Sequence, residues 1–540
     1  MLRRLILLAS VAACLAAGSA ASAAATSVCT GTCYAAPAGS GALFLFSGHG
    51  WGHGVGMSQY GAYGYALHGA DYRTILAHYY PGTTLGPAPA TTFRVLLADR
   101  KAKLTISSTV PFSVRDGAGT TVQLPAGPAS FDTTLRLGGK ALVAPLTFVP
   151  GKGGPLTLTR AYRGRISVDV VDGKLRAVNV VGLEQYLDGV VPAEMPSNWS
   201  AAALEAQAVA ARSYALATRN VGAPYDAYSD TRSQMYLGSS VESPATDAAV
   251  AATKKQVLWY AGKVATTYFS STSGGETESA LDWTGTAVPY LVSVADPYDA
   301  ISPYHDWGPV PVTAQAMAKD LKVAGPISDA TTVPNAAGRV AKLSLVTATA
   351  PVSVPGTTLR SALGLRSTWF TVGVLSLAPP PAAPLVYGSA LTLQGVVRGV
   401  GGTVTLEERQ SGGAWQPVSS VPAGAMKLAQ RPTITTDYRL ATAAAATGYV
   451  RIKVAPSVTL TSFTATEVAG SEQPVLAGDT VDIQQQSPDG SWATVGSAAV
   501  AADGTFTVPV SLASGDTYRV SLAAMPGYAA ATTAPQIVVR

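Results

Sequence analysis

A single carboxylate, Glu194, stands among rigid and apolar residues just before an alanine-rich stretch of the sequence. Its neighbours include Pro192, Met195, Pro196 and Trp199. A carboxyl group held against apolar surface loses hydration, so its pKa rises. A raised pKa suits a general acid that works near neutral pH. The alternative is an ordinary surface glutamate that precedes an amphipathic helix.

The helix expected after Glu194 creates a conflict. The positive end of a helix dipole favours a charged carboxylate by about 0.3–1 kcal/mol. Burial can move the pKa of a carboxyl group by several units in the opposite direction. A general acid at this position therefore requires apolar contacts, for which Met195, Trp199 and Trp51 are candidates.

A second unusual segment, 48–62, reads GHGWGHGVGMSQYGA and alternates glycine with larger residues. Alternating glycine leaves one side of the backbone bare, which lets another chain or a ligand approach closely. The segment does not have the spacing of a dinucleotide-binding loop. Four of the five histidines gather in or near it: His49, His53, His68 and His78. They indicate either a packed loop or, more weakly, a zinc site, because the segment contains no cysteine and no His-Glu-x-x-His arrangement.

Hydrophobic patterns predict the elements that position these residues. The apolar run 43–46 predicts a buried strand, and 71–80 predicts a helix that begins near Asp71. Short alternating runs across 93–191 predict a β-rich insert, and 200–219 predicts the alanine-rich helix. We therefore expect an α+β domain.

The C-terminal third of the chain repeats itself. A proline-rich stretch at 378–384 predicts a stiff, extended linker. Beyond it, an alternating strand, a glycine turn and a tryptophan recur at the same spacing, with Trp415 and Trp492 equivalent. The repeat predicts two β-sandwich, Ig-like modules at 385–456 and 457–540, which act either as a rigid spacer or in binding carbohydrate or wall.

The N-terminus has the pattern of an exported protein. Residues 1–23 predict a signal peptide, because arginines precede an apolar stretch that ends in a small-residue cleavage site. A lipoprotein attached through Cys14 is the alternative. Segment 24–42 is expected to be a linker in which Cys29 and Cys33 form a small disulfide or, alternatively, a metal pair.

Composition narrows the classes of partner. The formal net charge is only +5 over 540 residues. This excludes a strongly basic nucleic-acid-binding protein, while mild attraction to an anionic cell wall stays open. No apolar run of about 18 residues follows the signal, so we expect no transmembrane segment in the mature chain.

Three segments together resemble a known family. PAEMPSNWSAAALEAQAVAARSYAL at 192–216, the glycine-histidine motif at 48–62 and LRSALGLRSTWF at 359–370 are similar to the SpoIID/LytB family, which includes stage II sporulation protein D and amidase enhancers. The resemblance implies a SpoIID-like mixed α/β catalytic domain over 43–377. In relatives the glycine-histidine motif follows the LRxxLGLxSTxF motif, whereas here it precedes the domain, which indicates a circular permutation.

The resemblance also implies a function. It indicates an exported lytic transglycosylase that cleaves peptidoglycan glycan strands stripped of peptides, in wall remodelling or sporulation. Glu194 would be the single catalytic acid, and the product of the cleavage would be an anhydro sugar. A non-catalytic modifier of a cell-wall amidase and a wall-binding structural protein are the alternatives.

The expected site extends beyond Glu194, with no metal or cofactor required. By resemblance, the glycine-histidine motif supplies the cleft residues His53, Ser58, Gln59 and Tyr60. We also expect Trp51, Trp199 and Arg212 to bind substrate. The polar turn that follows Ser270 should contribute Ser273, Gly274 and Gly275.

Overall fold

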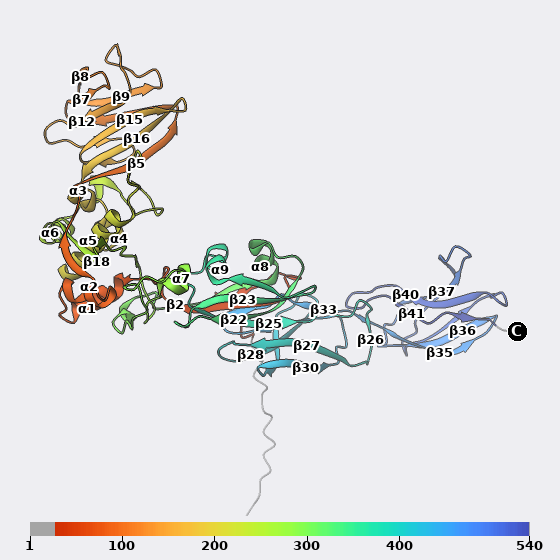
Figure 1. Cartoon of the computed structure of the whole chain (residues 1–540). Coiled ribbons are helices and arrows are strands. Elements are labelled where there is room, and N and C mark those ends of the chain that lie inside the picture. Colours follow the sequence, from red (N-terminus) through yellow and green to blue (C-terminus); the bar gives the residue numbers. More distant parts are fainter. Residues whose placement is uncertain (1–26, 539–540) are drawn as a thin grey trace, which may run out of the picture.

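The computed structural model describes residues 27–538 of the chain (Figure 1). The predicted signal peptide and the alternative lipid-attachment residue Cys14 lie outside the described residues. About 16% of the chain is helix and 42% is strand, distributed over many sheets, which confirms a mixed α+β protein. Within the described part, no helix is both long and apolar enough to cross a membrane.

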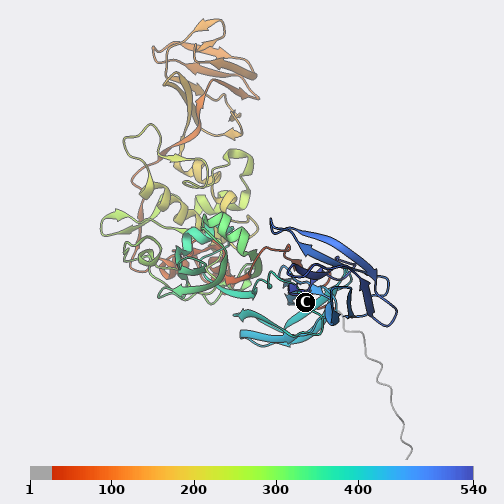
Figure 2. The ribbon, with the colours of Figure 1, turned by 90° about the vertical axis from the view of Figure 1, so that its right-hand side faces the viewer.

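The predicted β-rich insert is a seven-stranded sheet in the order β17-β5-β16-β15-β12-β7-β8. It projects from one end of the molecule, far from the C-terminal strands in both views (Figures 1 and 2). Its inward-facing residues form a continuous apolar core with α3. The main elements are β5 (Thr92–Lys101), β7 (Phe112–Arg115), β8 (Thr121–Leu124), β12 (Leu146–Val149), β15 (Arg165–Val171), β16 (Lys174–Gly182), β17 (Ala227–Tyr228) and α3 (Leu183–Asp188).

Below the insert, helices pack around the predicted alanine-rich helix, α5 (Ala201–Thr218). Its small side chains let α1 and α2 approach closely, and the three helices share one apolar core. The predicted start of α2 is confirmed, because the Asp71 carboxylate accepts a 2.8 Å hydrogen bond from the Thr74 N–H. The other helices here are α1 (Gln59–Leu67), α2 (Tyr72–Tyr79), α4 (Val191–Glu194), α6 (Pro244–Ala252) and α7 (Ala280–Thr284).

A five-stranded sheet in the order β21-β2-β25-β27-β30 connects this region to the C-terminal part. The predicted strand at 43–46 lies in β2 and pairs antiparallel with β25, with Phe44 opposite Val374. Alternate residues of β2 face two cores: Phe44 packs under α8 and α9, whereas Leu43 packs against the first module. The elements are β2 (Leu43–His49), β21 (Asp306–Thr313), β25 (Phe370–Leu377), β27 (Leu391–Arg398), β30 (Gly424–Gln430), α8 (Ala314–Leu321) and α9 (Gly356–Leu363).

The two predicted linkers are not free spacers. Segment 378–384 leads from β25 into the short strand β26 (Leu385–Val386), and β27 follows. β25 and β27 pair directly within one sheet, so the main domain and the first module share that sheet. The described part of the other predicted linker, residues 27–42, packs on the first module through β1 (Tyr34–Ala35), which pairs with β32 (Ala445–Ala446). The Cys29–Cys33 disulfide expected in it is formed. Composition alone missed both contacts, because they depend on partners more than ten residues away in sequence.

The internal repeat corresponds to two copies of one strand arrangement. β28 (Val404–Gln410) lies between β29 (Gln416–Val421) and β31 (Thr436–Ala441). In the same way, β37 (Thr480–Gln486) lies between β38 (Trp492–Ala499) and β40 (Thr517–Leu522). Each repeated tryptophan is covered by an arginine, Arg439 over Trp415 at 4.2 Å and Arg519 over Trp492 at 4.1 Å. The second copy faces a sheet of β35 (Ser457–Phe463), β36 (Glu467–Gln473) and β39 (Thr505–Pro509).

Candidate functional site

A cleft of about 770 Å³ lies where the glycine-histidine motif meets the helical region. Aromatic and uncharged polar side chains form most of its wall. Glu194 is the only carboxylate among the described residues that line it. The lining comes from segments far apart in sequence: Trp51, Gly52, His53, Gln59, Glu194, Tyr214, Thr231, Ser233, Gln234, Met235, Tyr268, Phe269, Ser270, Ser271, Trp283 and Arg360.

Glu194 is the last residue of the short helix α4 and is half-buried at the cleft wall. Burial raises the pKa of its carboxyl group, and a hydrogen bond from the Met235 N–H to Oε1, 3.0 Å long, opposes this shift more weakly. The long helix α5 begins only at Ala201, after the N-cap residue Ser200. Desolvation therefore outweighs the opposing influence, as a general acid requires.

The alternating glycines pack against another part of the same chain. Gly50, Gly52, Gly54 and Gly56 all have positive φ, a backbone conformation that side chains disfavour. A Cβ on Gly56 would also lie 2.1 Å from the Tyr268 carbonyl oxygen. The close approach predicted from the sequence is therefore confirmed, and it aligns β3 (Met57–Ser58) with β20 (Phe269–Ser270).

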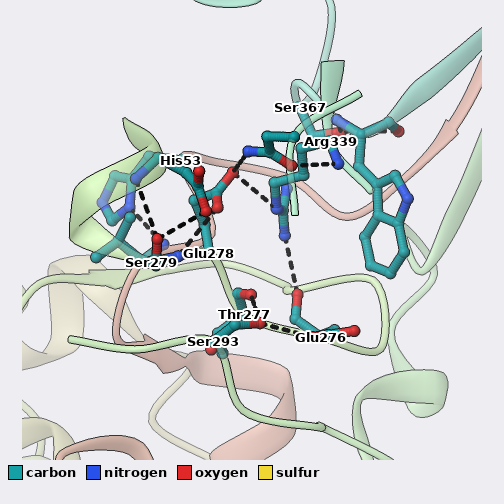
Figure 3. A network of polar contacts seen from close by, with 12 residues as sticks. His53, Glu276, Thr277, Glu278, Ser279, Ser293, Arg339 and Ser367 are labelled. Atoms are coloured by element: carbon teal, nitrogen blue, oxygen red, sulfur yellow. Dashed lines mark hydrogen bonds and ion pairs between the residues drawn. The ribbon is translucent and has the colours of Figure 1, made fainter. Parts of the chain in front are cut away.

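A buried ion pair supports the motif from behind (Figure 3). Arg339 is 1% exposed and donates hydrogen bonds to the carbonyl oxygens of Ser273 (2.8 Å) and Glu276 (3.0 Å). Its Nε lies 3.6 Å from a carboxylate oxygen of Glu278, whose backbone N–H donates to the Gly54 carbonyl at 2.9 Å. The network fixes the motif loop relative to the 270–279 segment.

His53 is a neutral wall residue of the cleft. Its ring stacks on Trp283 with centroids 4.7 Å apart, and its Nδ1 accepts a hydrogen bond from the Val55 N–H at 3.0 Å. Burial lowers the pKa of His53 to about 4, and two nearby arginines, Arg360 and Arg339, add to the shift. An imidazole in this state neither donates a proton nor carries charge near neutral pH.

The four clustered histidines do not converge on a common centre. His49 contacts Asp306, His68 stacks on Tyr298, and His78 bonds the Ala295 carbonyl, each at a separate place. Within residues 27–538, no group of three or more histidine, cysteine, aspartate or glutamate side chains is arranged to hold a metal. The residues therefore do not fit the zinc site considered from the sequence.

The structure divides the predicted site residues into two sets. Trp51, His53 and Gln59 line the cleft with Glu194. Seven predicted residues do not line it: Ser58, Tyr60, Trp199, Arg212, Ser273, Gly274 and Gly275. Tyr60 and Trp199 lie edge to face at 4.8 Å, and both stay only partly buried.

Four of the predicted binding residues are buried parts of the scaffold, and this corrects the prediction. Arg212 is 0% exposed and pairs with Glu184 at 2.6 Å. The Ser58 hydroxyl donates to Asp299 at 2.6 Å, and the Gly274 N–H donates to the same carboxylate at 2.9 Å. The Ser273 hydroxyl donates to Asp296 at 2.8 Å. These groups have satisfied hydrogen bonds within the protein and hold the loop in place, so they do not face a substrate.

Several lining residues were missed by the sequence interpretation. Tyr214 follows Glu194 by 20 positions on the face of α5 that meets the cleft, and Trp283 belongs to the short helix α7. Met235 and Tyr268 come from loops. Arg360 belongs to the LRSALGLRSTWF segment and could have been singled out there. Its relevance depends on the cleft it enters, which no local pattern indicates.

A family model described as stage II sporulation protein, SpoIID, matches residues 171–260. The match contains Glu194, all of α5 and the Met235 segment of the cleft. This part of the chain is similar to the SpoIID family. The SpoIID match covers less than a fifth of the chain, and the insert strands before β15 and both C-terminal modules lie outside it.

Individual relatives agree with the SpoIID assignment. Stage II sporulation protein D of Bacillus subtilis is 35% identical over 156 residues, which cover 26% of this chain and 45% of that protein. The amidase enhancer of Bacillus subtilis is 42% identical over 113 residues, or 21% of this chain and 15% of that protein. An uncharacterized protein of Brachyspira hyodysenteriae is 40% identical over 136 residues, 25% of this chain and 37% of that protein.

The alignments span less than half the length of these SpoIID relatives. The names of two of these relatives connect those proteins with sporulation and with the enhancement of an amidase. Among solved structures, a two-domain fibronectin type-III segment of chicken tenascin aligns with 31% of the chain and 97% of that segment. Its TM-score is 0.21 at 14% identity, too low to inform the fold.

Proposed function

We propose that this protein is an exported peptidoglycan lytic transglycosylase and that Glu194 is its single catalytic acid and base. The observation that supports this most directly is the isolation of Glu194: a desolvated carboxyl group with a raised pKa, without a second carboxylate among the described residues of its cleft. Hydrolytic glycosidases generally use two carboxylates. A reaction without water needs only one.

In the proposed reaction, the Glu194 carboxyl group alone donates and then takes back the proton. Protonated Glu194 donates its proton to the glycosidic oxygen as the bond from that oxygen to C1 breaks. The 6-hydroxyl oxygen of the same sugar then bonds to C1, and its proton passes to the Glu194 carboxylate. The products are a free chain end and a 1,6-anhydro sugar, and the enzyme returns to its starting protonation state. The stacked rings at His53 and Trp283 suit the apolar faces of sugars.

Analysis of reaction products tests this proposal. Purified mature protein should release anhydro-muropeptides or anhydro-disaccharides from glycan strands, most readily from strands stripped of their stem peptides. Mass spectrometry distinguishes the anhydro product because its mass is lower by one water than the mass of the hydrolysis product. Absence of that product from both intact and stripped strands would reject the activity.

The second candidate is a non-catalytic modifier that stimulates a cell-wall amidase. The 42% identity to a protein named amidase enhancer favours it, although that match covers only 15% of the relative. It predicts that the chain accelerates peptide release by an added amidase and that Glu194→Gln leaves this stimulation unchanged. A wall-binding structural role through the two C-terminal, Ig-like modules is a further alternative without a site observation of its own.

We also infer that the SpoIID domain is circularly permuted. The pairing of β2 with β25 supports this, because β2 takes the place that a strand directly following β25 would occupy in a hairpin. Permutation is tolerated where the joined ends lie close together at the surface. The signal-peptide pattern supports export and a place in the cell wall.

A further inference from the structure

Arg360 is the only lysine or arginine among the described residues that line the cleft. Across residues 27–538 it forms no ion pair with a carboxylate, unlike the buried residues Arg212 and Arg339. It is half-buried, and desolvation lowers the pKa of its guanidinium group. A desolvated cation without an opposite charge is costly, so a ligand that supplies that charge gains affinity.

The position of Arg360 is fixed by the backbone. It lies in the last turn of α9, and its Nε donates a 3.1 Å hydrogen bond to the Arg366 carbonyl oxygen. The same carbonyl accepts a 2.9 Å hydrogen bond from the Gly52 N–H of the glycine-histidine motif. The two Nη groups have no hydrogen-bond partner within the described part of the chain. They are the pair of donors that can bind a carboxylate through both its oxygens.

An aromatic surface lies around Trp51, which lines the same cleft as Arg360. Trp51 lines the cleft, is 41% exposed and meets Tyr304 edge to face at 4.4 Å. The Arg366 guanidinium lies 4.5 Å from the Tyr304 ring centre and also forms no ion pair with a carboxylate in residues 27–538. The cleft thus combines an exposed indole, a face for a sugar ring, with guanidinium groups that have no carboxylate partner in residues 27–538 and can supply charge to an anion on that ring.

We propose that Arg360 binds a carboxylate carried by the glycan and that Trp51 contacts the sugar that bears it. The inference rests on the proposed function for its substrate class, and it adds the group that the cleft recognises and the residue that recognises it. Glycan strands offer this chemistry from two sources. One is the lactyl carboxylate of a muramic residue without a peptide, and the other is the set of carboxylates on a stem peptide.

A binding experiment tests the subsite apart from catalysis. The full chain carrying Glu194→Gln is titrated with peptide-free strands, with the same strands amidated at their carboxyl groups, and with peptide-bearing strands. Affinity should fall about tenfold on amidation, the loss of one charge-assisted, two-pronged contact. Adding Arg360→Gln should lower affinity for the acid strands by a similar factor and leave affinity for the amidated strands unchanged.

The peptide-bearing strands separate the two sources. Arg360-dependent affinity confined to peptide-free strands assigns the lactyl carboxylate, whereas the same dependence on peptide-bearing strands assigns the peptide. Arg360→Lys keeps the charge without the two-pronged geometry and should retain part of the preference. Arg136→Gln, which removes an exposed arginine of the insert, is the matched control and should change no affinity.

The proposal is overturned if acid and amidated strands bind equally, if Arg360→Gln weakens both to the same extent, or if neither binds. These outcomes are independent of the lytic activity, which is measured by anhydro products from the wild-type chain. A chain that binds acid strands through Arg360 but releases no anhydro sugar would reject the activity and keep the subsite.

Discussion

The side-chain amide of Gln59 donates a 2.9 Å hydrogen bond to the backbone carbonyl of Glu194, a residue 135 positions away. The same Nε2 lies 3.4 Å from the amide oxygen of Gln207 on α5. The glycine-histidine motif thus holds the backbone of the candidate acid against the alanine-rich helix. Gln59 is 8% exposed, so these bonds form in a largely dry environment.

Replacing Gln59 by leucine should shift the position of Glu194 while leaving its carboxyl group chemically intact. We expect anhydro-sugar release to fall about tenfold, and the free energy of unfolding to fall by about 1–3 kcal/mol because a buried carbonyl loses its donor. A role in positioning Glu194 also predicts an altered pH–rate profile, which a purely structural role would not change. Gln185→Leu, at an exposed position on α3, is the control and should alter neither the rate nor the profile.

Glu194→Gln should abolish anhydro-sugar release, because the amide has the shape of the carboxyl group but cannot transfer the proton. The fold should persist, since the amide can still accept the Met235 N–H bond. Circular dichroism and product analysis by mass spectrometry measure the two effects. Glu205→Gln removes a half-buried glutamate of α5 outside the cleft and should keep full activity; activity retained by Glu194→Gln would assign the acid elsewhere.

The raised pKa of Glu194 predicts how stability depends on pH. In the unfolded chain this carboxyl group ionises around its ordinary value of 4.5, whereas burial keeps it protonated to higher pH in the folded chain. Between the unfolded and the folded pKa, the unfolded state therefore binds fewer protons than the folded state. The protonated carboxyl group contributes to stability fully below pH 4.5, and this contribution is lost as the pH rises through the folded pKa. Thermal denaturation should show Glu194→Gln more stable than wild type at neutral pH, with the difference vanishing below pH 4.5. A pH-independent difference would contradict the raised pKa.

Burial lowers the pKa of His53 to about 4, so this residue should not change its protonation state between pH 5 and 8 and should not shape the pH–rate profile there. The pH–rate profile of His53→Asn should keep the shape of the wild-type profile, although its height falls because the stacking on Trp283 is weakened. A limb near pH 6.5 that disappears in His53→Asn would show instead that the imidazole takes part in proton transfer.

Gly54→Ala should destabilise the motif more than a positive φ alone explains. The new Cβ would lie 2.5 Å from the Arg339 guanidinium, at a residue whose φ is +79°. Gly69→Ala is a matched control, because its φ is +86° and nothing lies within 4 Å of the added carbon. Chemical denaturation should give a loss of about 1 kcal/mol for Gly69→Ala and a further loss of about 1–3 kcal/mol for Gly54→Ala from the clash. Equal losses of stability for the two variants would show that the Arg339 side chain moves away from the new Cβ at no cost in free energy.

Much of the architecture could be predicted locally. A short apolar run indicated β2, an aspartate indicated the start of α2, and a repeated tryptophan spacing indicated two similar C-terminal modules, because each signal acts over a few residues. The apolar neighbours of Glu194 indicated a desolvated carboxyl group for the same reason. Alternate glycines indicated a close approach without indicating which segment approaches.

What the sequence by itself determined is therefore the chemistry of single segments: one carboxylate in apolar surroundings, one glycine motif and one family resemblance. Only the tertiary structure decided which polar residues face the cleft. Ser58, Ser273 and Arg212 carry suitable groups, but hydrogen bonds and an ion pair within the protein satisfy them. Arg360 has no such carboxylate partner within residues 27–538, and it lines the cleft. Satisfaction of a polar group depends on partners far away in sequence, so no local pattern can decide it.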